Sequence, residues 1–260
     1  MPVDPDPGSL PEPPRDGSGI WSWELPSLAA DSLPLVLHIG QRRLEVGTIV
    51  DISAAGPVGP LGLATLLVGA GFHLDGQAVP GRSGTQRARV VRDRTLADSI
   101  GPDMSLLVCG VNPSPYSADA GIGYARPGNR FWPAALAAGI APVDRDPVAA
   151  LAAGTGMTDF VKRATRTAAE VTRDEYEAGF TRVSRLVEWL EPGAVCFVGL
   201  SGWRTVVDSR AVAGHQPVTV GGRPAYVMPS TSGLNARSSL ADLTRHLGAA
   251  RDLALRPGMT

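Results

Sequence analysis

The sequence predicts an α/β protein in which helices cover both faces of a mostly parallel central sheet. Three apolar runs are expected to form its strands: Leu106–Gly110, Ala194–Leu200 and Ala225–Met228. Helical patterns alternate with these runs, as expected where crossover helices join parallel strands. A second, smaller α/β unit precedes this three-layer domain.

The composition of the chain changes at two places, which gives three segments. Residues 1–16 contain six prolines and four acidic residues and little that can be buried, which predicts a disordered tail. Residues 17–97 form the small N-terminal unit, whose role the pattern does not indicate. Residues 98–260 form the three-layer domain.

The N-terminal unit shows strand-like runs and one apolar helix. Leu35–Ile39 and Leu44–Ile52 are expected to form a hairpin, and a glycine-rich turn then leads into a helix at Leu63–Ala70. This order resembles a phosphate-binding unit, but prolines remove N–H donors from the turn, which favours a plain βα unit. The arginine-rich segment Thr85–Thr95 predicts an amphipathic edge strand facing solvent, with a minor DNA-contacting surface as the alternative.

Helix signals in the second domain are clearer. A helix at Trp132–Ala138 ends at Gly139, and Thr172 with Glu175 forms a capping box that begins a long helix. The remaining predicted elements are a short helix, a hairpin and a final helix: Ser201–Val207, Val218–Val220 with Ala225–Met228, and Ser239–Leu253.

Composition excludes several classes of site. The 260 residues have a formal net charge of −1, so overall charge does not favour a nucleic-acid partner. Cys109 and Cys196 each lie in an apolar run and are expected to be buried, and two thiols are too few for a cysteine-only zinc site or an iron–sulfur cluster. We expect no metal and no cofactor. Without a long apolar run or a signal-peptide pattern, we expect a cytoplasmic protein with no membrane association.

Two predicted loops leave strand ends with unusual chemistry: 112–129 and 229–237. We expect them to face each other across a crevice at the carboxyl edge of the sheet, where such folds bind ligands. Asn112 can orient a water molecule but cannot deprotonate it, which suits a dissociative reaction; a turn asparagine before proline is the alternative. Tyr124 can stack on a planar ligand or pack against the core. Leu234, apolar at a polar loop tip, suits a wedge between stacked bases, although it can also fold inward.

The two loops together resemble a known family. GVNPSPYSADAGIGYARPGNRFW (Gly110–Trp132), followed by MPSTSGLNAR (Met228–Arg237), is similar to the mismatch-specific uracil/thymine DNA glycosylases of the uracil-DNA glycosylase superfamily. Their first motif has the form G-I-N-P-G and continues to P-x-N-R/H-F-W at this spacing, and their second is a Pro-Ser/Asn-x-Ser-x loop. The resemblance covers residues 104–253 and includes the intervening GMTDFVKR segment; residues 1–95 lie outside it.

The resemblance implies a role for each matching residue. Asn112 matches the catalytic asparagine that positions the attacking water, and Tyr124 matches the aromatic that stacks on the extruded base. Ser114 stands where the family usually has glycine, which implies a narrower base pocket. Further matches line the base pocket or contact the DNA: Val111, Ser114 and Ser117 at the base, Ser230 and Ser232 at the phosphates, Gly233, Leu234 and Asn235 as the wedge, and Arg237 close by, one position later than the family's arginine.

The resemblance therefore implies a monofunctional DNA glycosylase of base excision repair. It would flip uracil opposite guanine, with thymine and ethenocytosine as further candidates, and hydrolyse the N-glycosidic bond. The expected partner is double-stranded DNA, and the expected form is a monomer associated with the nucleoid. Alternatives are a non-catalytic DNA-binding protein on this fold, a glycosylase acting on deaminated purines, and a separate activity in the N-terminal unit.

Overall fold

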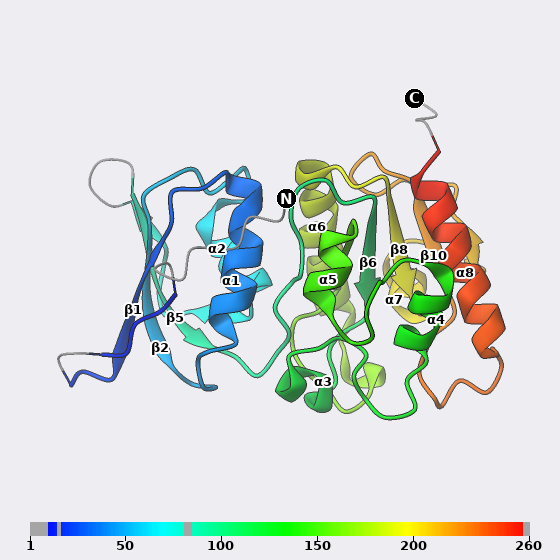
Figure 1. Ribbon diagram of the computed structural model, residues 1–260, viewed down its shortest axis with the longest axis horizontal. Coiled ribbons are helices and arrows are strands. Elements are labelled where there is room, and N and C mark those ends of the chain that lie inside the picture. The colour runs from blue at the N-terminus through cyan, green and yellow to red at the C-terminus, as the bar shows by residue number, and fades with distance from the viewer. Residues whose placement is uncertain (1–9, 15–16, 81–84, 257–260) are drawn as a thin grey trace.

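The computed structural model describes residues 10–14, 17–80 and 85–256, which contain two sheets that lie side by side (Figure 1). Most of the predicted tail, 1–16, lies outside the described residues. Its described part is packed rather than free, because Glu12 forms a β-bridge with Ser22 and Pro11 is buried.

The first sheet belongs to the N-terminal unit and has the strand order β1-β2-β5-β3, with β4 also paired to β5. β1 and β2 are parallel, and β5 runs antiparallel to its neighbours. Two helices pack on one face. The elements are β1 (Ile20–Leu25), α1 (Leu33–Gln41), β2 (Ile49–Ala54), α2 (Gly62–Gly69), β3 (Phe72–Leu74), β4 (Val79–Pro80) and β5 (Gln86–Arg92).

Two predictions for this unit are wrong. The run Leu35–Ile39 lies inside helix α1, not in a strand, because a short apolar run fits a buried helix as well as a strand and Pro34 suits a first helical turn. The segment Thr85–Thr95 forms an internal strand, since β5 has partners on both sides. Its amphipathic pattern is confirmed over most of the strand: Ala88 and Val90 are buried and Arg87 and Arg89 are exposed, whereas Arg92 at its end is buried.

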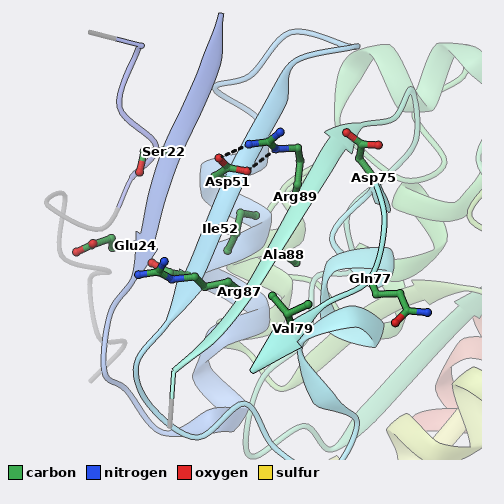
Figure 2. Close-up of a pocket in the computed structure, with 11 residues that line it drawn as sticks. Ser22, Glu24, Asp51, Ile52, Asp75, Gln77, Val79, Arg87, Ala88 and Arg89 are labelled. Atoms are coloured by element: carbon green, nitrogen blue, oxygen red, sulfur yellow. Dashed lines mark hydrogen bonds and ion pairs between the residues drawn. The ribbon is translucent and has the colours of Figure 1, made fainter. Parts of the chain in front are cut away.

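The outer face of this sheet is polar and carries mixed charge (Figure 2). Asp51 and Arg89 form a two-point ion pair across β2 and β5, with distances of 2.7 and 2.8 Å. Glu24, Asp75 and Arg87 line the same shallow cavity of about 560 Å³. Opposite charges thus alternate over this face.

The second sheet has the order β7-β6-β8-β10-β9. Its first four strands are parallel, and only the edge strand β9 is antiparallel, so the predicted mostly parallel sheet is confirmed. The predicted hairpin is wrong in its first arm: β10 pairs with β9, whereas Val220 bridges to Arg223 in a tight turn. The strands are β6 (Leu106–Gly110), β7 (Thr155–Asp159), β8 (Ala194–Val198), β9 (Gly214–His215) and β10 (Ala225–Met228).

Helices cover both faces of this sheet, because successive strand residues enter different cores. Leu106 and Val108 pack with α4 and α8, whereas Leu107 and Cys109 pack with α6 and α7. The capping box at Thr172 is present as predicted. The helices are α3 (Pro115–Ala120), α4 (Phe131–Ala138), α5 (Pro147–Ala152), α6 (Arg173–Leu190), α7 (Leu200–Val206) and α8 (Leu240–Ala254).

The N-terminal unit and the second domain share one hydrophobic core. Buried residues of the first unit, such as Trp23 and Leu67, belong to the same cluster as Leu186 and Phe197 of the second domain. The segment that joins the units is itself largely buried between Thr95 and Ile100. The two units are therefore packed together and not connected by an exposed linker.

Cys109 and Cys196 are both free and fully buried, as predicted. Over residues 10–14, 17–80 and 85–256, no helix is long and apolar enough to cross a membrane. The same described ranges contain no group of three His, Cys, Asp or Glu side chains placed to hold a metal ion.

Candidate active site

Asn112 lies two residues beyond the end of β6, and hydrogen bonds from its amide nitrogen hold its side chain in place. The amide nitrogen Nδ2 donates hydrogen bonds to Thr165 Oγ1 at 2.7 Å and to the carbonyl of Arg163 at 3.0 Å. Both amide hydrogens are thereby used, so the remaining polar atom is Oδ1, which can only accept. This arrangement fixes an acceptor at the strand end, where it can orient a water molecule.

The segment that holds Asn112 is anchored to the same strand end by backbone hydrogen bonds. Val161 donates to the carbonyl of Val111 at 3.0 Å, and Thr165 donates to the carbonyl of Pro113 at 3.1 Å. Thr165 is also buried, and its hydroxyl donates to the carbonyl of Thr167 at 2.7 Å. The orientation of Asn112 is therefore built into the fold and does not need a ligand.

Asp159 ends β7 and stands opposite Gly110, the last residue of β6. A Cβ atom on Gly110 would lie 2.2 Å from Asp159 Oδ1 and 3.0 Å from the Tyr124 hydroxyl, so both groups converge over this glycine. No described residue donates a hydrogen bond to the Asp159 carboxyl. Burial is the main reason that its pKa rises to about 6, and Asp98 adds to the rise while Lys162 opposes it.

Tyr124 takes a left-handed backbone conformation, with φ of 59°, unusual for a residue other than glycine. Its ring stacks on Phe131, with centroids 4.0 Å apart and an interplanar angle of 19°. Phe131 therefore covers one face of the Tyr124 ring. The hydroxyl is buried without a hydrogen-bond partner, and burial raises the pKa of Tyr124, so the group stays neutral.

Ser114 and Ser117 lie at the start of a short helix, α3, that was not predicted from the sequence. Ser114 caps α3: its Oγ accepts a hydrogen bond from the Ser117 backbone N–H at 3.2 Å. The same hydroxyl donates to Ser117 Oγ, also at 3.2 Å. The serine in place of the family's glycine thus has a local structural role as a helix cap.

The second loop is ordered by its own side chains. The hydroxyls of Ser230 and Ser232 accept hydrogen bonds from the backbone N–H groups of Ser232 and Leu234, which leaves their hydrogens available to donate to phosphate. The Asn235 amide donates to the carbonyl of Ser230 at 2.8 Å, so it also holds the loop closed. Leu234 projects from the tip with 86% of its surface exposed. Arg237 is exposed as well.

Arg130 connects the two loops. Its backbone N–H donates to the carbonyl of Thr231, and its guanidinium donates to the carbonyls of Ser232, Asn235 and Ser238. Arg130 lies between the first loop and helix α4, so its hydrogen bonds hold the second loop against the end of the first. A ligand-binding crevice between the two loops stays a prediction.

A buried ionic cluster lies beneath this site. The Asp98 carboxylate accepts from Lys162 Nζ, an Arg182 guanidinium nitrogen and Thr158 Oγ1, each at 2.7 Å. Burial acts to raise the pKa of Asp98, but the charges of Arg182 and Lys162 outweigh it and hold the pKa below its ordinary value. The cluster fixes the segment that begins at Asp159 and ends at Thr165.

Three functional candidates were missed at the sequence level: Thr165, Asp159 and Arg130. Thr165 and Asp159 lie in or beside the GMTDFVKR segment, whose match to the family gave the only signal for them. Arg130 stood inside the first motif, but its contacts reach residues more than 100 positions away. None of the three carries a local pattern that indicates its role.

Asp159 is expected to lower the stability of the folded protein at neutral pH. Its folded pKa, about 6, lies above the ordinary aspartate value of 3.8, so stability falls as pH rises through this interval. Asp159→Asn is expected to raise the free energy of unfolding by about 1–3 kcal/mol at pH 8 and to change it little near pH 4. Urea denaturation at both pH values measures this; an equal change at both would contradict the assignment.

The fold and the site thus define an α/β protein with an asparagine fixed at the end of a parallel strand, opposite a loop with an exposed apolar tip. The chain belongs to the uracil DNA glycosylase superfamily, whose family model matches residues 97–253. Membership implies base excision of the uracil-DNA glycosylase type, with DNA as substrate. A solution NMR structure of a candidate uracil DNA glycosylase from Methanosarcina acetivorans is 21% identical, with a TM-score of 0.41, and the match covers 62% of this chain and 97% of that one.

Proposed function

We propose that the protein is a monofunctional DNA glycosylase that extrudes uracil paired with guanine and hydrolyses its N-glycosidic bond. The observation that carries the proposal is the fixed Asn112 amide, whose Oδ1 is left as an acceptor at the strand end. Water orientation by an amide, without a strong base, is suited to a reaction in which the glycosidic bond is largely broken before attack.

In the proposed reaction the bond between C1′ and the base nitrogen breaks, and its electron pair leaves with the base. The resulting cationic sugar is attacked by the water that Asn112 Oδ1 orients, and a C1′–O bond forms. The water releases one proton, and the departing base anion gains one from solvent. Tyr124 would stack on the extruded base.

Asp159 is proposed to contact the edge of that base. Its carboxyl is the ionisable group that converges with Tyr124 over Gly110. A neutral carboxylic acid can donate to a pyrimidine carbonyl oxygen and accept from the adjacent N–H, whereas a carboxylate can only accept. Burial raises the pKa of Asp159 to about 6, so a fraction of the carboxyl groups is protonated near neutral pH.

The chain offers no free lysine amine for a covalent mechanism. Lys162 is the single lysine in the sequence, and its ammonium group is ion-paired to Asp98 with a side-chain exposure of only 11%. A glycosylase that also cleaves the DNA strand through a lysine Schiff base needs an accessible neutral amine. This supports simple hydrolysis of the base.

A panel of lesion-bearing duplexes tests the proposal. The purified chain is expected to release uracil from a G·U duplex and to leave the abasic strand uncut until alkali is added. Thymine, ethenocytosine and hypoxanthine opposite their usual partners complete the panel. Absence of base release from every duplex would refute the glycosylase assignment. Release of hypoxanthine alone would indicate that the substrate is a deaminated purine and not uracil.

Leu234 is expected to fill the space that the extruded nucleotide leaves. Leu234→Ala is expected to slow uracil release from a G·U duplex about tenfold, because the variant forgoes roughly 1–2 kcal/mol of apolar packing against the stacked bases. Release from single-stranded DNA, which has no gap to fill, should change little. Leu255→Ala, which also truncates an exposed leucine, is the matched control. Equal slowing on both substrates would argue against a wedge.

A further inference from the structure

The N-terminal unit is attached directly to the loop that carries the candidate site. The Arg94 guanidinium, just beyond β5, forms a two-point ion pair with Asp119 of α3, at 2.6 and 2.5 Å. The Arg42 guanidinium lies over Gly121, where a Cβ atom would be 3.2 Å from Arg42 Nε. Helix α3 lies between Asn112 and Tyr124 in the loop that would hold the flipped nucleotide. Because Arg42 directly follows α1, its position over Gly121 places the end of α1 beside this loop (Figure 1).

Arg42 and Arg43 present positive charge at this position. Both are exposed, and neither takes part in the ion pairs formed within the described ranges. The exposed acidic residues nearby are Glu45, in the same loop, and Asp119, which is already paired with Arg94, so the two arginines leave an excess of positive charge.

The loops of the candidate site carry further arginines of the same kind. Arg126 lies two residues after Tyr124, Arg166 directly follows Thr165, and Arg237 ends the second loop. All three arginines are exposed, and the ion pairs found in the part of the chain that the structure describes do not include them. Arginines from both units therefore surround the loops that would meet DNA, although the net charge of the whole chain is only −1.

We infer that the N-terminal unit extends the DNA-binding surface, with Arg42 and Arg43 contacting backbone phosphates of the duplex beside the flipped nucleotide. The inference rests on the proposed function, because it takes double-stranded DNA as the partner. The helix end that carries the two arginines is held against the second domain, since Leu33, Val36 and Leu37 of α1 belong to the hydrophobic core that the two units share. Phosphate contacts of this kind add affinity without sequence preference.

The outer face of the first sheet does not fit the same partner. The cavity on that face is lined by Glu24, Asp51 and Asp75 as well as by Arg87 and Arg89, so acidic groups would oppose phosphate there (Figure 2). That face supplies a control, because Arg87 is exposed and lines this mixed-charge cavity of the N-terminal unit (Figure 2).

The test compares the salt dependence of DNA binding among full-length variants. The probe is a duplex with an uncleavable abasic-site analogue opposite guanine, so that binding is measured without base release. The variants are Arg42→Gln with Arg43→Gln, the charge-retaining pair Arg42→Lys with Arg43→Lys, and the control pair Arg87→Gln with Arg256→Gln. Arg256 is an exposed arginine just beyond the end of α8. Thermal melting shows that each variant is folded.

The glutamine pair is expected to reduce the slope of log K against log salt by about 2, or roughly one unit for each phosphate that the variant no longer neutralises. From 50 to 200 mM salt, the wild type should then lose about 16-fold more affinity than this variant. The lysine pair and the control pair should keep the wild-type slope.

Three outcomes would overturn the inference: a wild-type slope in the glutamine pair, an equal reduction of the slope in the lysine pair, or an equal reduction in the control pair. Failure of the proposed function is seen separately. In that case the wild type releases no base from the lesion panel, whatever the slopes are.

Discussion

Replacement of Asn112 by alanine is expected to lower the rate of uracil release by about two to three orders of magnitude, the usual effect of removing one oriented polar group from a reacting centre. The variant loses the Oδ1 acceptor that would orient the attacking water. DNA affinity should remain close to that of the wild type, since the side chain is directed by Thr165 and Arg163 and not by the DNA. Single-turnover release from a G·U duplex gives the rate, and binding to an uncleavable duplex gives the affinity.

Thr165 provides a graded companion to this experiment. Thr165→Val keeps the shape of the side chain but removes the acceptor for Asn112 Nδ2, whereas Thr165→Ser keeps the hydroxyl. We expect an intermediate loss of rate in the valine variant, without a large change in KM, and near wild-type rates in the serine variant. If Asn112→Ala cleaves as fast as the wild type, the water-orienting role is wrong; if the serine variant is as slow as the valine variant, the orientation of Asn112 does not depend on this hydroxyl.

The elements that carry the two motifs could be predicted because their signals are local. Buried strands such as β6 and β8 are unbroken apolar runs, and the cap at Thr172 is marked by Glu175 three positions later. The position of Asn112 at a strand end follows from the same reasoning. These predictions needed no knowledge of distant contacts.

Other parts of the structure depend on contacts that no local pattern encodes. Strand β7, TGMTD, lacks an apolar run, and it is a strand because β6 pairs with it over five residues. The short apolar run of α1 fits a strand as well as a helix, and packing against the first sheet favours the helix. Thr165 reaches Asn112 across 53 residues of sequence. The site was thus predictable as far as its motifs, but the groups that hold it in place were not.

Removal of the Asp98 carboxylate is expected to be the most destabilising single change proposed for this protein. Asp98→Ala leaves Lys162 and Arg182 buried without their counter-charge, with side-chain exposures of 11% and 10%. Loss of one partner from such a buried cluster costs about 3–5 kcal/mol, against a total stability of roughly 5–15 kcal/mol for a typical protein. For a chain of this size, the melting temperature should fall by roughly 6–20 °C.

Asp51→Ala is the matched control, because the Asp51–Arg89 pair has the same two-point geometry but is half exposed, at 50% and 45% (Figure 2). Its loss should cost less than about 1 kcal/mol. The wild type should also lose stability as pH falls below about 4, because the lowered pKa of Asp98 means that its contribution is present above the unfolded pKa and disappears as the folded carboxylate is protonated. Asp98→Ala should lack that part of the acid sensitivity. Equal destabilisation by the two alanine variants in urea denaturation would mean that the buried cluster contributes no more than a surface ion pair, and that the segment from Asp159 to Thr165 is held by its backbone hydrogen bonds alone.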